Sequence, residues 1–358
     1  MDCLGGYVNG LFGLFPDVLD GIIKGGSTHP FDFTLFKFIV NGLLMSLIGV
    51  FGFTGNLLCI IILCRLQRRS SSSTNVILIA LAIFDVIVVV LPIFKIGIPA
   101  MCEYLKDQYS CYYTDNIAPR IFFVLYGLSN IALTGSAYCT LAVTVERYIA
   151  ICWPFKSMTI CTFGKAKNTV IAISAASIIY NIPRFLEHEM NMIPDSCTEI
   201  PNIGCGYLSK SKTYRDAHWW MFIVVQYIIP FVCLTVLNVL TYFEVKKSTT
   251  REASATVSTI SRDTRSDRKL AAVVIRLVLV YQICYLPVLM LFIWNAGKLI
   301  GNSDWYNAIK SVGNALIVLN SSVNFLIYIS NSNKFRKELR IFGKSYICSS
   351  KMCAENYT

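Results

Sequence analysis

Residues 75–94 read NVILIALAIFDVIVVVLPIF, an apolar run in which Asp85 is the one charged residue. A helix needs about 20 mainly apolar residues to cross the hydrocarbon core of a bilayer. Further segments of this kind lie at residues 38–64, 121–145, 168–183, 219–243, 277–297 and 311–330. The segment 168–183 is short and needs Phe185 and Leu186 to complete it. The sequence therefore predicts seven membrane crossings.

The composition agrees with a chain whose solvent is lipid. Of its 358 residues, 55% are hydrophobic and 15% are charged, which is too apolar for a soluble fold of one or two domains. The apolar segments are continuous and do not alternate in polarity, so helices rather than barrel strands must satisfy their backbone hydrogen bonds. We therefore predict an all-α membrane protein, a seven-transmembrane-helix bundle. Pro92, Pro183, Pro230 and Pro287 predict kinks or weak points within it.

Lysine and arginine are distributed unequally between the segments that join the crossings. The segments after the first, third, fifth and seventh crossings carry most of them. Basic segments favour the cytoplasmic side, so we expect residues 1–37 to form an extracellular N-terminal tail, residues 38–330 the bundle, and residues 331–358 a cytoplasmic amphipathic helix and tail. Basic cytoplasmic segments beside anionic lipid also account for the net charge of +11, without nucleic acid as a partner.

The last segment contains the pattern of a membrane-surface helix. Phe335, Leu339 and Phe342 recur at helical spacing with charged residues between them. Cys348 and Cys353 follow, and each is either a palmitoylation site or a plain reduced cysteine.

Asp85 lies in the middle of its crossing, where a charge costs roughly 2.5 to 3.5 kcal/mol on insertion scales. One interpretation is a packed carboxylate that accepts hydrogen bonds from its neighbours. The other is an ion or proton site inside the bundle. Polar partners for either are present on other crossings: Asn56, Ser136, Asn320, Ser321 and Asn324.

Two further groups of residues suggest chemistry at the ends of the bundle. Glu146-Arg147-Tyr148 closes the third crossing, and its adjacent charges form either an ordinary interfacial pair or a releasable lock, in which Arg147 exchanges a carboxylate for a cytoplasmic partner. Four cysteines fall in the first and second outside loops, where an oxidising compartment favours disulfides. They are Cys102, Cys111, Cys197 and Cys205, and all three possible pairings stay open.

In chain order, these motifs resemble those of the class A, or rhodopsin-like, G-protein-coupled receptors over nearly the entire chain. The matching elements are Gly55-Asn56, Leu81-Ala82-Ile83-Phe84-Asp85, Glu146-Arg147-Tyr148, Pro230, Cys284-Tyr285-Leu286-Pro287 and Asn320-Ser321-Ser322-Val323-Asn324-Phe325-Leu326-Ile327-Tyr328. The chain also departs from the common pattern. Tyr285 replaces a Trp, Phe325 replaces a Pro, and Phe122 stands where the third crossing usually has a bridging cysteine.

The class resemblance implies a mechanism and a set of site residues. An external ligand would favour an arrangement in which the sixth crossing moves outward and opens a cleft for a heterotrimeric G protein. The residues implied at that cleft are Glu146, Arg147, Tyr148, Asn324 and Tyr328. An allosteric sodium ion, with no other cofactor, is implied at Asp85, Ser136, Asn320, Ser321 and Asn324.

A narrower resemblance concerns the outer end of the fourth crossing. The run Tyr180-Asn181-Ile182-Pro183-Arg184-Phe185-Leu186-Glu187 is similar to the invertebrate FMRFamide-type neuropeptide receptors. It implies a receptor in the plasma membrane with a short peptide as its extracellular ligand.

The outer ends of the crossings suit such a ligand. Amine receptors of this class carry an Asp where this chain has Ser129, and retinal pigments carry a Lys where it has Val318, so both are disfavoured. Aromatic and polar groups converging on a concave site suit a short peptide, and Glu187 or Glu189 is a candidate partner for an arginine on it. The predicted ligand-binding residues are Lys95, Tyr126, Ser129, Arg184, Glu187, Gln226, Tyr285 and Trp294.

Other function classes have weaker support. The sequence shows no metal cluster, nucleophile–base pair or phosphate-binding glycine loop at a meaningful spacing, so we expect no enzyme. A secondary transporter has the multiple crossings and Asp85 in its favour, but internal repeats are not visible. A class A receptor for a lipid, an odorant or another small molecule is the remaining alternative.

Overall fold

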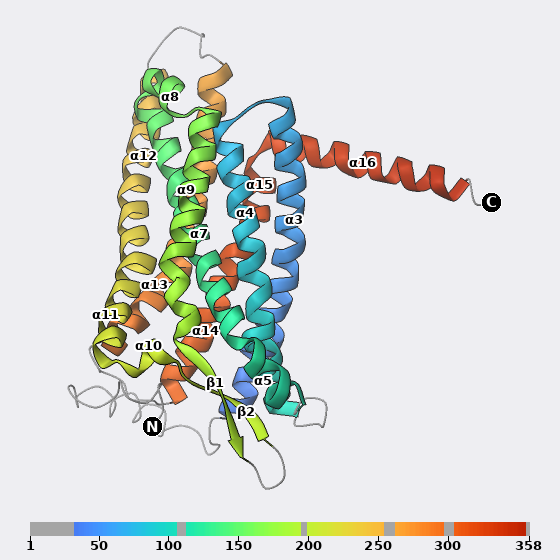
Figure 1. The fold of residues 1–358 in the computed structure, drawn as a ribbon. Coiled ribbons are helices and arrows are strands. Elements are labelled where there is room, and N and C mark those ends of the chain that lie inside the picture. The colour runs from blue at the N-terminus through green and yellow to red at the C-terminus, as the bar shows by residue number, and fades with distance from the viewer. Residues whose placement is uncertain (1–31, 106–111, 195–198, 254–261, 297–303, 356–358) are drawn as a thin grey trace, which may run out of the picture.

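The computed structural model describes residues 32–105, 112–194, 199–253, 262–296 and 304–355. Within these residues, seven helical spans are long and apolar enough to cross a membrane, and they stand side by side as a bundle (Figure 1). The spans are Phe33–Arg69, Ser73–Leu105, Tyr113–Cys152, Phe163–Leu186, Lys212–Lys247, Ala271–Leu291 and Tyr306–Asn331. The chain is a multi-pass membrane protein, and the predicted fold class is confirmed.

Most spans are composed of more than one helical element. The elements of the first three are α2 (Phe33–Lys37), η1 (Phe38–Leu44), α3 (Met45–Arg69), α4 (Ser73–Pro92), η2 (Ile93–Gly97), α5 (Ile98–Leu105), η3 (Tyr113–Ile117) and α7 (Ala118–Cys152). After α8 (Pro154–Ile160), the others are built from α9 (Phe163–Asn181), η4 (Ile182–Leu186), α11 (Lys212–Ile223), η5 (Val224–Ile228), α12 (Ile229–Ala253), α13 (Arg262–Ala296), α14 (Asp304–Ser322) and α15 (Asn324–Asn331). Four of the η elements are π-helical, and η4 is a 3-10 helix.

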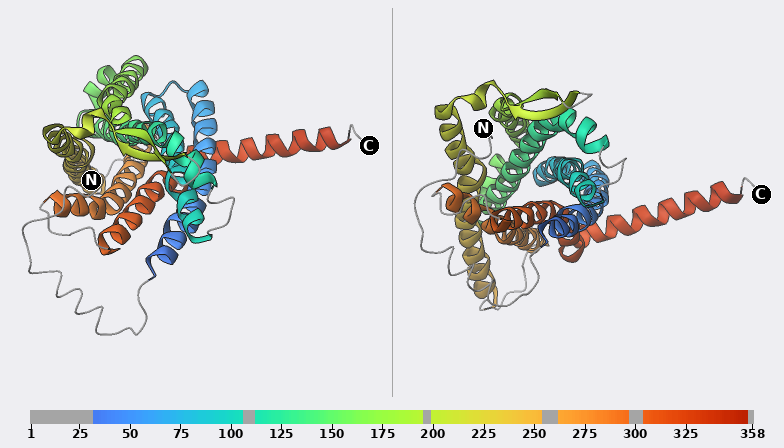
Figure 2. Two further views of the ribbon diagram at one scale, coloured as in Figure 1. Left: turned by 60° about the horizontal axis from the view of Figure 1, so that its bottom comes forward. Right: turned by 90° about the horizontal axis from the view of Figure 1, so that it is seen from below.

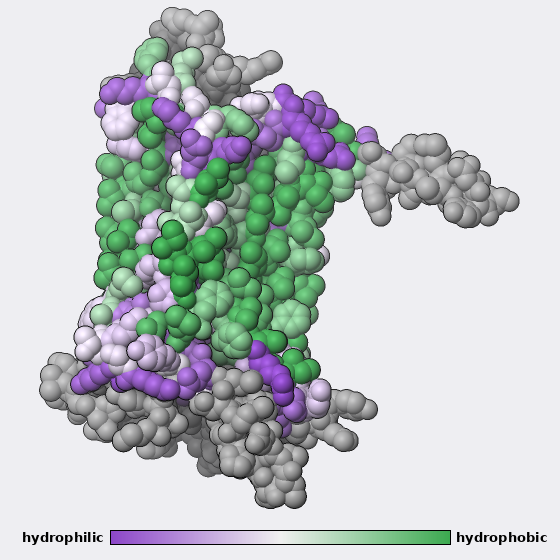
Figure 3. Space-filling model, in the orientation of Figure 1, coloured by the Kyte–Doolittle hydropathy of each residue, from purple (hydrophilic) through white to green (hydrophobic). Residues whose placement is uncertain are grey.

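Six of the seven spans pack in a closed ring, and the fourth, α9, packs against α7 and α4. Helix α3 packs against α4, α4 against α7, α7 against α12, α12 against α13, and α13 against α14, which returns to α3, as the views along the bundle show (Figure 2). Side chains that are almost fully buried fill the interior, among them Cys59, Val143, Leu234, Val278 and Tyr281. The face shown in Figure 3 is apolar along the middle of the bundle and carries hydrophilic residues toward both ends. Leu47 and Ile283, each 69% exposed, belong to this lipid-facing surface.

The two ends of the bundle carry different features. At one end, β1 (His188–Pro194) and β2 (Glu199–Cys205) form an antiparallel hairpin, with His188 opposite Cys205 and Pro194 opposite Glu199. The short helix α10 (Tyr207–Lys210) follows it. At the other end, α16 (Asn333–Glu355) projects away from the bundle (Figure 1). We call these the hairpin end and the α16 end. The hairpin was not among the predicted elements.

The prolines expected to interrupt the spans lie next to changes in helix type. Pro92 ends α4, and the π-helical η2 begins at the next residue. Pro183 lies in η4, and Pro230 follows shortly after the π-helical η5. Because proline lacks a backbone N–H, it cannot complete the hydrogen bond of a regular α-helical turn. By contrast, α13 runs continuously through Pro287.

The seventh span breaks between α14 and α15 even though Phe325 stands in place of a proline. The hydroxyl of Ser322 lies within hydrogen-bonding distance of the carbonyl oxygens of Val318 (2.7 Å) and of Ile48 on α3 (3.1 Å). Gly52 makes this close approach possible, because a Cβ at that position would lie 2.1 Å from Ser322 Oγ. The polar packing of Ser322 therefore accompanies the break.

Helix α16 is attached to the bundle by apolar and charged contacts. The Phe335 ring is 1% exposed and lies 5.7 Å from the ring of Tyr328. Glu338 Oε2 forms an ion pair with Arg69 Nη1, with 2.8 Å between the two atoms. The predicted amphipathic helix is present, and Phe335 is the most buried of its described side chains.

We expect Phe335→Ala to loosen α16, since truncating a buried Phe typically costs about 3 kcal/mol or more. Hydrogen–deuterium exchange should show faster exchange of the backbone amides that follow Asn333. Phe155→Ala is the matched control, because Phe155 is 90% exposed. Unchanged protection of α16 in the Phe335 variant would show that other contacts hold the helix.

Candidate functional site

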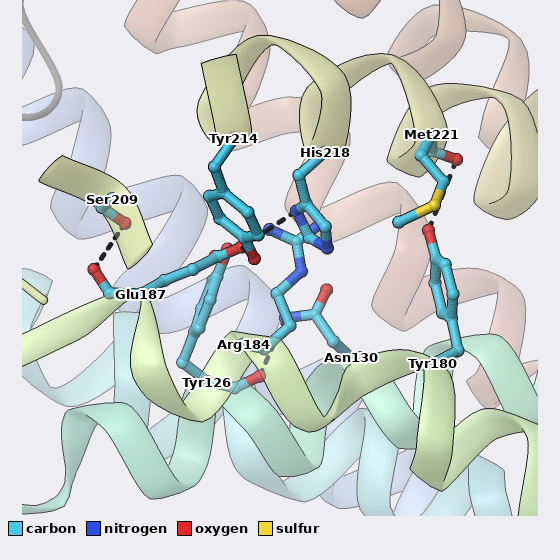
Figure 4. A network of polar contacts seen from close by, with 9 residues as sticks. All are labelled: Tyr126, Asn130, Tyr180, Arg184, Glu187, Ser209, Tyr214, His218 and Met221. Carbon is cyan, nitrogen blue, oxygen red and sulfur yellow. Dashed lines mark hydrogen bonds and ion pairs between the residues drawn. The ribbon is translucent and has the colours of Figure 1, made fainter. Parts of the chain in front are cut away.

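Five polar side chains meet inside the hairpin end, and we call them the Glu187 cluster. Tyr126 comes from α7 and Arg184 from η4; Glu187 follows η4 directly, and Tyr214 and His218 lie on α11 (Figure 4). The 3-10 turn brings Arg184 and Glu187 onto one side of the chain, where they form an i,i+3 ion pair. Segments far apart in the sequence are thereby joined at one place.

Glu187 is the acceptor that holds this cluster together. Arg184 Nη1 donates to both carboxylate oxygens, at 2.9 and 3.2 Å, and His218 Nδ1 lies 2.9 Å from Oε1. The phenol groups of Tyr214 and Tyr126 donate at 3.2 and 3.3 Å. Each carboxylate oxygen therefore accepts at least two hydrogen bonds, and the Glu187 side chain is only 9% exposed.

The surroundings of Glu187 decide its charge. Burial of the carboxyl would raise its pKa, but the hydrogen bond from His218 and the charge and hydrogen bonds of Arg184 lower the pKa to about 2. A folded-state pKa below the ordinary value of 4.5 means that the ionised group stabilises the fold fully above that value, and that this stabilisation is lost as the pH falls toward about 2. Glu187 is therefore a carboxylate at neutral pH.

We expect Glu187→Gln to lower the thermal melting midpoint of the solubilised protein at neutral pH, because it removes the acceptor charge of the cluster. The gap to the native protein should narrow as the pH falls below 4.5, where native Glu187 begins to lose its contribution. Melting curves between pH 7 and about pH 3 measure it. Glu189→Gln is the control, since Glu189 is more exposed and pairs with exposed Lys210. A gap that is independent of pH would contradict this account.

The other predicted ligand-binding residues are divided between this cluster and separate contacts. Lys95 Nζ lies 5.6 Å from the Tyr126 ring centroid, beside the cluster. Ser129 Oγ donates to Leu125 O within its own helix at 2.6 Å. Gln226 Oε1 accepts from Thr134 Oγ1 at 2.7 Å. Tyr285 stacks on Tyr281 with the ring centroids 4.0 Å apart. Trp294 lies in α13, but its side chain is outside the described part of the structure.

Asp85 lies in the middle of the bundle and is fully buried, at 0% exposure. Ser136 Oγ donates to Oδ1 at 2.7 Å, and Asn324 Nδ2 donates to Oδ2 at 2.6 Å. Ser321 lies beside the carboxylate, and its buried hydroxyl makes no hydrogen bond within the described residues. No hydrogen bond joins Asn320 to Asp85 among those residues. Asn56 Nδ2 instead donates to the backbone oxygen of Ser321 at 2.8 Å.

This arrangement fits a small cation. A fully buried carboxylate requires a compensating positive charge or several hydrogen bonds, and no ion pair within the described residues involves Asp85. The oxygens of Asp85, Ser136 and Ser321 come from three different spans and are the hard ligands that such ions take. Both interpretations of Asp85 therefore remain compatible with the geometry: a hydrogen-bonded packing carboxylate and an ion site.

The second charged group lies at the α16 end. Arg147 Nη2 forms an ion pair with Glu146 Oε1 at 3.0 Å, and both residues are buried. Thr74 Oγ1 donates to the same carboxylate oxygen at 2.8 Å and accepts a hydrogen bond from Arg147 Nη2. Ser73 Oγ also donates to Glu146. The charge pair is therefore tied to the start of α4.

The remaining predicted coupling residues lie around this end. The ring of Tyr148 packs edge-on against Trp153, with 5.4 Å between the ring centroids. Tyr328, on α15, is 4% exposed and packs against Phe335. Asn324 begins α15 and contacts Asp85, so it belongs to the middle of the bundle rather than to the Arg147 contacts.

The predicted modification sites lie largely beyond what the structure describes. Cys111 and Cys197 are outside the described residues. Cys102 lies in α5, and Cys205 ends β2 opposite His188. Cys348 and Cys353 lie in α16, but their side chains are not described.

Several polar partners in these sites were not predicted from the sequence. Tyr214 and His218 complete the Glu187 cluster, yet α11 shows no motif around them. A possible signal was that His218 is one of three histidines in the chain, just before the apolar part of its span. Ser73 and Thr74, at the start of α4, have the hydroxyl groups that commonly satisfy charges or helix ends there.

Comparison with known proteins places the chain. Residues 55–328 match the family model of the 7 transmembrane receptor (rhodopsin family). The chain is 36% identical over 306 residues to an FMRFamide receptor of Drosophila melanogaster. That alignment covers 84% of this chain and 53% of that receptor. It is 28% identical over 338 residues to an FMRFamide peptide receptor of Caenorhabditis elegans, with 88% and 71% covered. It is 26% identical over 323 residues to the human thyrotropin-releasing hormone receptor, with 84% and 77% covered.

This chain thus spans about half the length of the Drosophila receptor. The family match runs from the first membrane span to the end of the seventh, and it includes Asp85, Arg147 and Tyr328. The chain therefore belongs to the rhodopsin family of seven-transmembrane receptors.

Proposed function

We propose that this chain is a plasma-membrane receptor that binds a short, FMRFamide-like neuropeptide outside the cell and activates a heterotrimeric G protein inside it. The observation that carries the proposal is the buried Glu187 cluster at the hairpin end, in a chain similar to two FMRFamide receptors. Such a receptor transmits binding free energy and performs no catalysis.

The hairpin end faces outward in this proposal. Basic residues support that orientation, because Arg68, Arg69, Lys165 and Arg336 lie at the α16 end, and positive charge favours the cytoplasmic side. Residues 1–37 then form an extracellular tail, and residues 331–358 form a cytoplasmic segment with α16 on the inner face of the bilayer. Cys348 and Cys353 are available there for palmitoylation, whereas Cys102, Cys111, Cys197 and Cys205 lie on the oxidising side.

Ligand recognition begins at the Glu187 cluster. Tyr126, Arg184 and the neighbouring Lys95 present aromatic and cationic groups that suit a peptide. Further proposed ligand contacts lie on the third, fifth and sixth spans: Ser129, Gln226, Tyr285 and Trp294. Glu187 is already saturated by the chain's own donors, so Glu189, whose side chain is 39% exposed, is the better partner for a ligand arginine.

Activation then follows from a difference in ligand affinity between two arrangements of the spans. In the arrangement described here, Arg147 is held by Glu146 and Thr74. When the sixth span moves outward, these contacts open and Arg147, with Tyr148 and Tyr328, faces the G protein. A sodium ion held by Asp85, Ser136 and Ser321, with Asn320 and Asn324 beside it, would supply a positive charge that favours the closed packing.

A peptide screen tests the proposal. Short peptides with an amidated Arg-Phe end should stimulate guanine-nucleotide exchange in membranes that contain the receptor, and scrambled peptides should not. A response to hydrophobic small molecules alone would replace the peptide with another ligand class. Peptide-driven solute flux without exchange would indicate a transporter. Antibody binding to an epitope at Thr358 on intact, unpermeabilised cells would overturn the orientation.

A further inference from the structure

One edge of the Arg184 guanidinium is buried and has no hydrogen-bond partner among the described residues. Its Nη1 atom donates to Tyr126 and to Glu187. Its Nε and Nη2 atoms are buried and make no hydrogen bond within the described residues. The side chain as a whole is only 8% exposed. Buried unpaired donors are unfavourable, so this edge points to an acceptor that the described part of the chain does not supply.

Two aromatic rings lie close to the Arg184 guanidinium. The guanidinium carbon lies 4.3 Å from the centroid of the Phe222 ring and 5.7 Å from that of Tyr126. Cation–π contacts use the faces of the planar group and leave its N–H edges available. A ligand group that reaches this edge would thus be an oxygen acceptor close to aromatic rings.

Charge balance restricts what that acceptor can be. Glu187 is ionised and lies 2.9 Å from Arg184, so the pair carries no net charge. A ligand carboxylate at the free edge would be a second negative charge close to Glu187, which is unfavourable in a buried site. A neutral carbonyl oxygen accepts from the same two N–H groups without that repulsion.

We propose that the Nε–Nη2 edge of Arg184 binds the C-terminal carboxamide oxygen of the peptide, and that Glu187 makes the site select the carboxamide over the free acid. His218 and Tyr214 act as positioning residues, because they hold Glu187 from α11. This inference rests on the proposed function and specifies which end of the peptide is recognised.

Three peptides test the contact on the full-length native receptor. They are Phe-Met-Arg-Phe-amide, its free acid, and Phe-Met-Arg-phenethylamide, which keeps the terminal ring but lacks the terminal carboxamide. The phenethylamide should be about 10- to 100-fold less potent than the amide in guanine-nucleotide exchange, the loss expected for one hydrogen bond to a charged group. In Arg184→Met the amide and the phenethylamide should differ little, since methionine has no N–H group to donate to the carboxamide. Equal potency of these two peptides on the native receptor would overturn the proposal.

The selectivity is tested by Glu187→Gln. Removing the negative charge should lower the preference for the amide over the free acid by about tenfold or more, because the acid is no longer repelled. The control Glu103→Gln should keep the native preference, since Glu103 is an exposed carboxylate that pairs with Lys37 outside the cluster. If Glu187→Gln prefers the amide over the free acid as strongly as the native receptor does, the role of Glu187 is overturned. Lys95 is then the charged group to test.

The outcomes separate this inference from the proposed function. If no amidated Arg-Phe peptide activates the native receptor, the proposed ligand class is wrong. If the peptides activate it but their C-terminal group does not matter, the ligand class stands and the Arg184 contact is wrong. For each variant, labelling of the receptor on intact cells measures how much of it reaches the cell surface. The three-peptide series on the native receptor decides the proposal even if a variant fails to reach the membrane.

Discussion

We expect Arg147→Ala to abolish G-protein activation and to leave peptide binding intact. Arg147 lies at the α16 end, where it bonds to Glu146 and Thr74, whereas the Glu187 cluster lies at the hairpin end. The substitution removes the guanidinium that the G protein would contact and changes no residue of the cluster. Peptide-stimulated exchange should fall to the level of receptor-free membranes, while saturation binding of a labelled peptide retains its affinity.

Two further variants make this result specific. Lys167→Ala should signal normally, because Lys167 is an exposed cation near the start of α9 and takes part in no described ion pair. Glu146→Gln should raise exchange in the absence of peptide, since it weakens the ion pair that holds Arg147. Normal signalling by Arg147→Ala would remove the proposed role of this residue.

The effect of sodium on agonist affinity should disappear in Asp85→Asn. Asparagine fills the same space but lacks the charge that would bind the cation, and Ser136 and Asn324 still have a polar partner. Coupling between two sites is typically 5- to 150-fold in affinity, so the native receptor should lose peptide affinity within that range when sodium replaces choline. The measurement is peptide competition binding at constant ionic strength.

Ser321→Ala is the intermediate case, because it removes one oxygen and keeps the carboxylate. It should weaken the dependence on sodium without abolishing it. If Asp85→Asn responds to sodium as the native protein does, Asp85 is a packing carboxylate held by Ser136 and Asn324.

Much of the fold could be predicted because lipid imposes a simple requirement on the sequence. Each span needs a long apolar run, and the seven runs were visible in order, including the weak fourth one, which the structure extends to Phe163–Leu186. The hairpin could not be predicted in this way. Its strands, His188–Pro194 and Glu199–Cys205, contain prolines and lack clear alternation, so its register depends on the chain around it.

The candidate site shows a similar division. Arg184 and Glu187 were singled out because they lie close together in a motif, and the structure does join them. Glu187 or Glu189 was the candidate partner for a ligand arginine, but His218 and Tyr214 approach Glu187 from α11. Sequence spacing cannot reveal a partner on another span, because that contact depends on how the helices rotate in the bundle.

The π-helical turns have a consequence for how insertions and deletions act on this bundle. A π-helical turn holds about one residue more than an α-helical turn, so Ile93–Gly97 already contains a spare residue. Deleting one residue there can restore regular winding and leave the crossing intact. The residues on both sides would then keep roughly their original orientation, whereas the same deletion in the regular helix α4 would turn everything beyond it by roughly 100° about the helix axis. A single lost codon in this segment should therefore disturb the packing of the second span less than one lost from Ser73–Pro92.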